Sequence, residues 1–141
     1  MGISILTKES TMRIIRNLIH SDLSLIKEFR DNIINLLEEE GYDENFIFKI
    51  RLVLDELIIN SYKHGNNKIY EKLIDIIIVV DEGSCMVKVR DEGDGIDYCK
   101  DRDMLSDHGR GIQLVYTLAD NFWVKDNTTV AFLELNDQKV C

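Results

Sequence analysis

Two long segments with helical periodicity follow each other almost without a break, and this feature most constrains the fold. In the segment 22–40 the apolar residues recur every three or four positions, as they do on one face of an amphipathic helix. Ser21 is a candidate N-cap for this helix, and Gly41 suits the position just after its end. A second stripe of the same kind begins after Asp43, another candidate N-cap, and runs to about His64. The sequence therefore predicts two consecutive amphipathic helices.

The other regular segments have the composition of strands, apart from one short helix. Residues 73–80 form a β-branched run that predicts a buried strand, and a tight turn at 82–84 leads into a second strand at 85–90. The remaining expectations are a strand at 12–19, a polar irregular stretch at 97–108, a helix at 111–119, and a hairpin formed by 121–125 and 128–135. The predicted order is βααββ(loop)αββ. This order is typical of an α+β fold with helices on one face of a mostly antiparallel, mixed sheet.

Length and composition favour one domain. The chain has 141 residues, no proline and no repeat, so we expect a single domain spanning 1–141 with a loosely held leader at 1–10. A net charge of −9 argues against direct binding to nucleic acid. Cys85, Cys99 and Cys141 lack metal-ligand spacing and are typical of free thiols in a cytoplasmic protein. We expect no signal peptide and no membrane-spanning segment.

Three polar residues stand four positions apart on the second predicted helix. Glu56, Asn60 and His64 are thereby expected on one face, at the border of the apolar stripe. The amide oxygen of Asn60 is a suitable ligand for a hydrated Mg²⁺ ion, and Glu56 can act as a base toward a hydroxyl or water. The alternative is a helix rim whose polar groups make local hydrogen bonds, and for His64 a structural role is the main interpretation.

The segment 91–95 (DEGDG) follows directly on a predicted strand. The carboxylate of Asp91 is an acceptor only, so it favours the amino group of adenine over the carbonyl of guanine. Gly93 and Gly95 allow the backbone to approach a flat base closely. A plain turn explains the same residues equally well.

A second glycine pair precedes the short helix. Gly109 and Gly111 flank Arg110, and free N–H groups at a helix start can bind phosphate. Arg110 can face the phosphates together with nearby cations, or it can be a solvated surface residue. Thr129, near the start of the last strand, can add a hydrogen bond to a base or be an ordinary strand residue. Neither glycine pair extends to the G-x-G-x-x-G pattern, and no P-loop is present, so those nucleotide-binding motifs are excluded.

Taken together, these stretches resemble the GHKL ATPase superfamily of gyrase, MutL and the histidine kinases. Glu56-x-x-x-Asn60 resembles its N box, Asp91-x-Gly93-x-Gly95 its first glycine box, and Gly109-x-Gly111 its second. The segment 127–129 resembles the final Gly-Thr-Thr segment, with Asn127 where glycine is common. The small size and the strings around these boxes resemble the bacterial anti-sigma factor serine/threonine kinases.

This resemblance implies a Bergerat α/β sandwich that binds ATP and Mg²⁺. It implies that Glu56 is the catalytic base, that Asn60 is the magnesium ligand, and that Asp91 reads adenine. The nucleotide-binding set that it suggests is Asn60, His64, Asp91, Gly93, Gly95, Gly109, Arg110, Gly111 and Thr129. The implied partners are an anti-anti-sigma protein with a STAS domain, a sigma factor and a second copy of the chain. A non-catalytic ATP- or ADP-binding module and a switch kinase with another partner are the alternatives.

Overall fold

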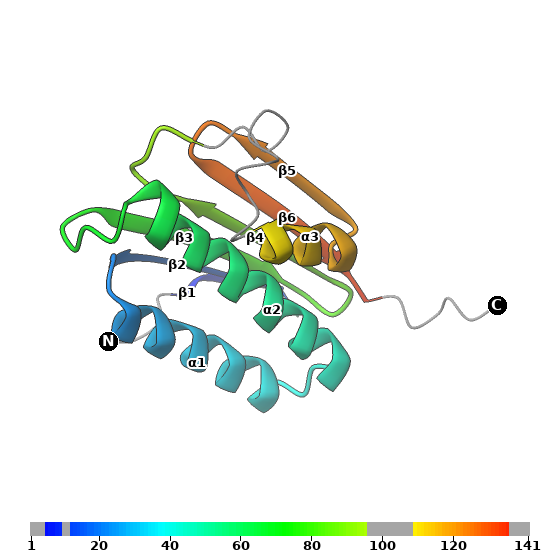
Figure 1. Ribbon diagram of the computed structural model, residues 1–141. Helices are drawn as coiled ribbons and strands as arrows, with labels where there is room; N and C mark the ends of the chain where they lie inside the picture. Colours follow the sequence, from blue (N-terminus) through cyan, green and yellow to red (C-terminus); the bar gives the residue numbers. More distant parts are fainter. Residues whose placement is uncertain (1–4, 10–11, 96–108, 136–141) are drawn as a thin grey trace.

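A computed structural model describes residues 5–9, 12–95 and 109–135 of the chain. The described residues form a two-layer sandwich, with three α-helices on one face of a six-stranded sheet (Figure 1). The strand order is β1-β2-β3-β4-β6-β5. Every pair among the described strands is antiparallel, where the sequence predicted a mostly antiparallel, mixed sheet. The α+β prediction is confirmed, and the predicted elements occur in the predicted order, with strand β1 added before them and the π-turn η1 after α2.

The strands end close to their predicted limits. They are β2 (Met12–His20), β3 (Leu73–Val80), β4 (Ser84–Arg90), β5 (Asn121–Lys125) and β6 (Thr128–Glu134). The prediction of a loosely held leader is wrong for one part of it, because residues Ile5–Glu9 form strand β1 and pair with β2. This pairing gives hydrogen-bond partners to backbone groups along an edge of β2 that would otherwise be open.

The two long helices are α1 (Leu23–Glu39) and α2 (Glu44–Asn60). Gly41 has a φ of +80°, so it ends the first helix as predicted. The predicted N-cap of α1 is wrong: Asp22, and not Ser21, accepts the N–H groups of Ser24 and Leu25. Ser21 is buried, and its hydroxyl donates instead to the carbonyl of Lys72. Ser21 therefore ties the connection between β2 and α1 to the segment before β3.

The second helix does not continue unchanged to residue 64. The α-helical pattern ends at Asn60, and residues Ser61–Gly65 form a turn of π-helix, η1. A π-turn contains more residues than an α-turn, so it rotates the side chains that follow it away from their α-helical direction. This rotation matters for the predicted face of Glu56, Asn60 and His64.

The core lies between the helices and the inner face of the sheet. Both helical stripes and alternate residues of β2, β3, β4 and β6 are buried there. Helix α3 (Gly109–Leu118) packs beside α2 and against β5. The C-terminal end of α2 lies close to the end of β4 and to the turn between β5 and β6, which are distant from it in the sequence.

Candidate functional site: a nucleotide pocket

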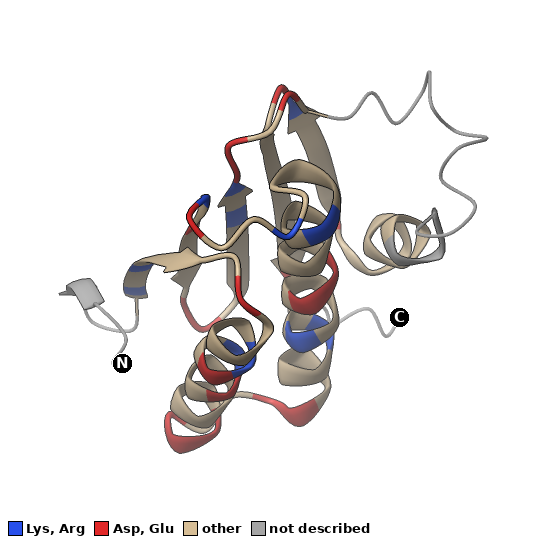
Figure 2. Ribbon diagram, turned by 60° about the vertical axis from the view of Figure 1, so that its left-hand side comes forward, with Lys and Arg blue, Asp and Glu red and all other residues tan. Residues whose placement is uncertain are grey.

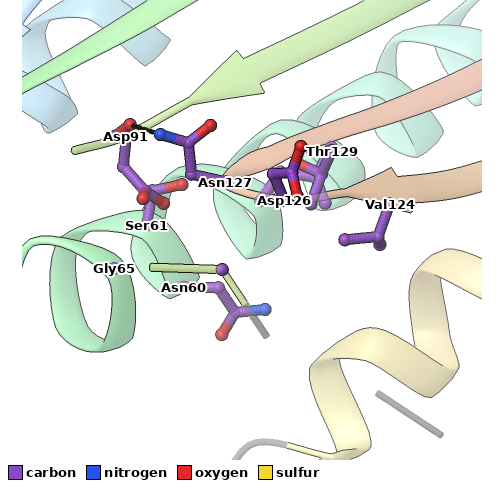
Figure 3. Close-up of a pocket in the computed structure, with 10 residues that line it drawn as sticks. Asn60, Ser61, Gly65, Asp91, Val124, Asp126, Asn127 and Thr129 are labelled. Atoms are coloured by element: carbon purple, nitrogen blue, oxygen red, sulfur yellow. Dashed lines mark hydrogen bonds between the residues drawn. The ribbon is translucent and has the colours of Figure 1, made fainter. Parts of the chain in front are cut away.

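A pocket lies where the end of α2 meets the loop after β4 and the turn between β5 and β6 (Figure 3). The hollow measures about 350 Å³ when open solvent is included, and only a small part of this volume is enclosed. The lining residues come from segments far apart in the sequence: Leu57, Asn60, Ser61, Gly65, Asp91, Gly95, Val124, Asp126, Asn127 and Thr129. The structure therefore brings together Asn60, Asp91, Gly95 and Thr129 from the predicted set.

Asn60 has a feature that is uncommon in a folded protein. Only 7% of the residue is exposed, and its buried Nδ2 makes no hydrogen bond within the described part of the chain. Leaving such a donor unpaired costs about 1–3 kcal/mol. Its position in the lining of the pocket offers an explanation, because a bound polar group or ordered water can pair with it. The side chain fits a ligand rich in oxygen atoms.

Asp91 is held between two glycines. A Cβ on Gly65 would collide with the carboxylate of Asp91, and a Cβ on Gly93 would collide with the backbone of Gly65. The N–H of Gly93 donates to Asp91 Oδ1 at 2.9 Å, which leaves the other carboxylate oxygen able to accept a further bond. Because glycine has no side chain, the loop at Gly93 and the helix end at Gly65 can lie in contact. Gly93 thus has a packing role, while Gly65 is a site residue that the sequence analysis did not select.

Asn127 clamps the same loop from the strand side. Its Nδ2 donates to the carbonyl of Asp91 at 2.6 Å, and its own carbonyl accepts the N–H of Asp91 at 3.1 Å. Figure 3 shows the side-chain bond next to the carboxylate. The residue that departs from the glycine of the resembled family therefore fixes Asp91 with its side chain. Gly95 has a φ of +91° and lies against the carbonyl of Asp126, so a side chain is excluded there.

Thr129 lines the pocket, and its hydroxyl donates to the carbonyl of Val89 at 3.4 Å. This long bond lies within the sheet, as expected for an ordinary strand residue. Both interpretations of Thr129 therefore remain compatible with its position.

Glu56 lies one helical turn before Asn60 and is half-buried. Burial raises the pKa of its carboxyl group, and the neighbouring charge of Asp55 raises it further, while Lys63 has the opposite effect. A carboxylate with a raised pKa is a stronger base than an ordinary one. Glu56 is not among the residues that line the pocket, so it stands beside the pocket.

The structure does not bring His64 into the site. The side chain is exposed, and the residue does not line the pocket. The π-turn from Ser61 to Gly65 explains this departure from the expected helix face, because it shifts the direction of the residues after Asn60. His64 is thus exposed where Asn60 is buried, and a nucleotide-binding role for His64 stays a prediction.

The second glycine box starts helix α3, which begins at Gly109. The helix begins two residues before the predicted start at residue 111, and it lies next to α2. The side chain of Arg110 and the polar irregular stretch predicted at 97–108, which contains Lys100 and His108, lie outside what the structure describes. Cys99 and Cys141 also lie outside it, whereas Cys85 is a buried free thiol.

One cluster of acidic residues lies away from the pocket, whereas Asp91 and Asp126 are part of its lining. Five exposed acids surround the connection between α1 and α2, at the lower ends of the helices in Figure 2: Glu38, Glu39, Glu40, Asp43 and Glu44. A helix of 17 residues is about 25 Å long, so these charges are separated from Asn60 by more than two Debye lengths at physiological salt. These five charges are therefore screened from an anionic ligand at the other end of α2.

The sequence from residue 19 to residue 133 matches the histidine kinase-like ATPase domain family. The match covers more than half of the chain, and the chain belongs to this family, which is part of the GHKL superfamily. A comparison with curated proteins finds no match. The fold is that of an ATP-binding domain, and binding of ATP in this family typically involves Mg²⁺.

The pocket fits this ligand. The unpaired Nδ2 of Asn60 and the glycine contacts around Asp91 leave polar groups directed to a common space. No group of three or more His, Cys, Asp or Glu residues with metal-site geometry occurs within the described ranges. A magnesium ion would take the oxygen of Asn60 together with phosphate and water oxygens, as is usual for this ion. None of the described helices has the length and apolar character needed to cross a membrane.

Proposed function

We propose that the chain is an ATP-dependent serine/threonine protein kinase that acts as an anti-sigma factor. In this proposal it phosphorylates an anti-anti-sigma protein with a STAS domain and sequesters a sigma factor, and it works as a homodimer. Membership of the ATPase domain family supports the nucleotide chemistry. The resemblance of the boxes to the anti-sigma kinases supports the choice of substrate and partners.

The observation that carries the proposal is the position of Glu56. Its carboxyl group has a raised pKa, and the residue stands one helical turn before Asn60, which lines the pocket. A base in this position can accept the proton of an incoming serine or threonine hydroxyl. Most of the rate acceleration in phosphoryl transfer comes from positioning and from neutralising charge.

The other residues bind and orient the nucleotide in this proposal. Asp91 accepts a hydrogen bond from the adenine amino group with the carboxylate oxygen that Gly93 leaves available. Asn60 supplies an oxygen ligand to magnesium, which when bound neutralises charge on the phosphates. Leu57 and Val124 provide apolar surface in the same pocket, against which the adenine ring can pack.

The test is transfer of a radiolabelled γ-phosphate from ATP to a STAS-domain partner. The native chain is expected to label a serine or threonine of the partner, and Glu56→Gln is expected to abolish labelling while it still binds ATP. Glu39→Gln is a matched control, because Glu39 is an exposed glutamate at the far end of α1. If Glu56→Gln transfers phosphate at the native rate, Glu56 is not the base.

A second function is a regulatory module that binds ATP or ADP without transferring phosphate. The observation in its favour is that Glu56 stands beside the pocket and not in its lining. Calorimetry would then show saturable binding of Mg-ATP, while no partner becomes labelled. A pull-down that identifies the bound protein separates an anti-sigma role from a switch kinase that gates a different partner.

A further inference from the structure

Asn66 is a polar residue with no exposed surface. It follows η1 directly, its relative exposure is 0%, and it does not line the pocket. A buried carboxamide is tolerated when its hydrogen-bonding groups are paired, and otherwise it destabilises the fold. Its surroundings therefore show what the residue does.

Both ends of the carboxamide are paired. Nδ2 donates to the hydroxyl of Ser21 at 2.9 Å and to the carbonyl of Leu73 at 3.0 Å. Oδ1 accepts the backbone N–H of Glu92 at 2.8 Å. Exchanging the two ends would place donor against donor and acceptor against acceptor, so this network defines the orientation of the side chain. Asn66 thus joins three segments that are 7 to 45 residues away from it.

The bond to Glu92 acts on the loop that presents Asp91. Asn127 holds this loop on the strand side through the backbone of Asp91. Asn66 holds it on the helix side, one residue further along. The carboxylate of Glu92 adds a bond by accepting the N–H of Leu73 at 2.6 Å. The contact between Gly65 and the Asp91 carboxylate lies next to Asn66 in the sequence. A shift of the loop at Glu92 would therefore move the Asp91 carboxylate.

We infer that Asn66 is a positioning residue for purine recognition. Its carboxamide sets the Asp91 loop at a fixed place relative to the end of the helix that carries Asn60. The inference rests on the proposed role of Asp91 in reading adenine, and it does not depend on phosphate transfer. Asn66 itself does not touch the nucleotide.

The experiment compares Asn66→Ala with Ser21→Ala by calorimetry with ADP and GDP, at a temperature well below both unfolding midpoints. Ser21→Ala removes one partner of Nδ2 and leaves the bond to Glu92 in place. Asn66→Ala is expected to weaken ADP binding by about tenfold, the effect of one net hydrogen bond, and to lower the preference for ADP over GDP. Ser21→Ala is expected to keep the native affinity and preference, although its unfolding midpoint falls.

Asn66→Asp is the conservative variant. It keeps an oxygen acceptor for the N–H of Glu92 and loses the donor to Ser21 and Leu73. Its second oxygen lies against the carbonyl of Leu73, so we expect it to be much less stable than the native chain and, in its folded fraction, to bind ADP more tightly than Asn66→Ala. Equal ADP affinity and equal preference in Asn66→Ala and Ser21→Ala would overturn the inference. A native chain that binds no adenine nucleotide would overturn the proposed function as well.

Hydrogen exchange of the native protein tests the inference where Asn66→Ala does not fold. In the absence of nucleotide, the amide of Glu92 is expected to exchange slowly, because it donates to a buried acceptor. Exchange of this amide at the rate of an unstructured chain would show that Asn66 does not hold the loop.

Discussion

Replacement of Gly65 by alanine offers a sharp test of the pocket, because the atoms nearest to the added methyl group belong to a side chain. The three closest atoms to the new Cβ all belong to the carboxylate of Asp91. The φ of Gly65 is not in the left-handed region, so alanine is compatible with the backbone. The strain is relieved when Asp91 turns away, at the cost of its bond from the N–H of Gly93. We therefore expect Gly65→Ala to fold.

The expected effect falls on nucleotide binding. A hydrogen bond to a charged acceptor is worth about 1.5–3 kcal/mol, which corresponds to roughly a ten- to 150-fold change in Kd. Loss of the carboxylate from its place is expected to weaken ATP binding by a factor in this range. The unfolding free energy is expected to fall by about 1.5–3 kcal/mol at most, because the lost bond from the N–H of Gly93 also goes to the charged carboxylate of Asp91. Calorimetry with Mg-ATP measures the first quantity, and urea unfolding of the nucleotide-free chain measures the second.

Two other glycines provide controls. Gly83→Ala meets no atom within 4 Å and is expected to match the native chain in both measurements. Gly93→Ala meets the backbone of Gly65, which cannot turn away, so it is expected to lose about 1–3 kcal/mol of stability through overpacking. Native ATP affinity in a folded Gly65→Ala chain would refute the reasoning, and so would a loss of affinity explained entirely by unfolding.

Three further predictions concern the carboxyl group of Glu56, the apolar core and the thiol of Cys85. Since the pKa of Glu56 is raised in the folded state, its ionisation destabilises the fold as pH rises through that pKa; Glu56→Gln is therefore expected to be more stable than the native chain at pH 7 in urea unfolding, and a less stable variant would contradict this sign. Ile33→Ala removes a fully buried side chain of α1 remote from the pocket, so it is expected to cost about 2–5 kcal/mol in the same assay and to leave the ATP affinity of the folded fraction unchanged. Burial raises the pKa of Cys85 to about 12, so peptide mapping after maleimide treatment at pH 7.5 is expected to find this thiol unlabelled in the native chain and labelled in urea; rapid native labelling would show that the strand opens.

Local pattern was sufficient to predict most elements and two central site residues. The stripes of α1 and α2 predicted both helices, because apolar residues at helical spacing need one buried face. The β-branched run of β3 predicted a buried strand for a similar reason. Asn60 and Asp91 were identified because an amide near an apolar helix face and a carboxylate after a strand suit binding of a polar ligand. These inferences depend on residues close together in the sequence.

Contacts between distant segments decided the rest of the site. The sequence analysis did not select Gly65, whose contact with Asp91 and place in the pocket lining arise only in the folded chain. Asn127 stands where the resembled family commonly has glycine. Its bond to Asp91 joins residues 36 positions apart, so the sequence alone did not reveal it. The helix continues after Asn60 as a π-turn that contains His64, and sequence periodicity does not reveal such a turn.

The sequence by itself determined the order of helices and strands, the apolar faces and the types of polar group available for a nucleotide. The tertiary structure decided which of those groups meet and which loop is held in place. Asn66 and Asn127 hold the loop of Asp91 through hydrogen bonds on either side of it. The physical reason is that periodicity and capping act within a few residues, whereas a pocket is made by packing and hydrogen bonds between segments that only the folded chain brings together.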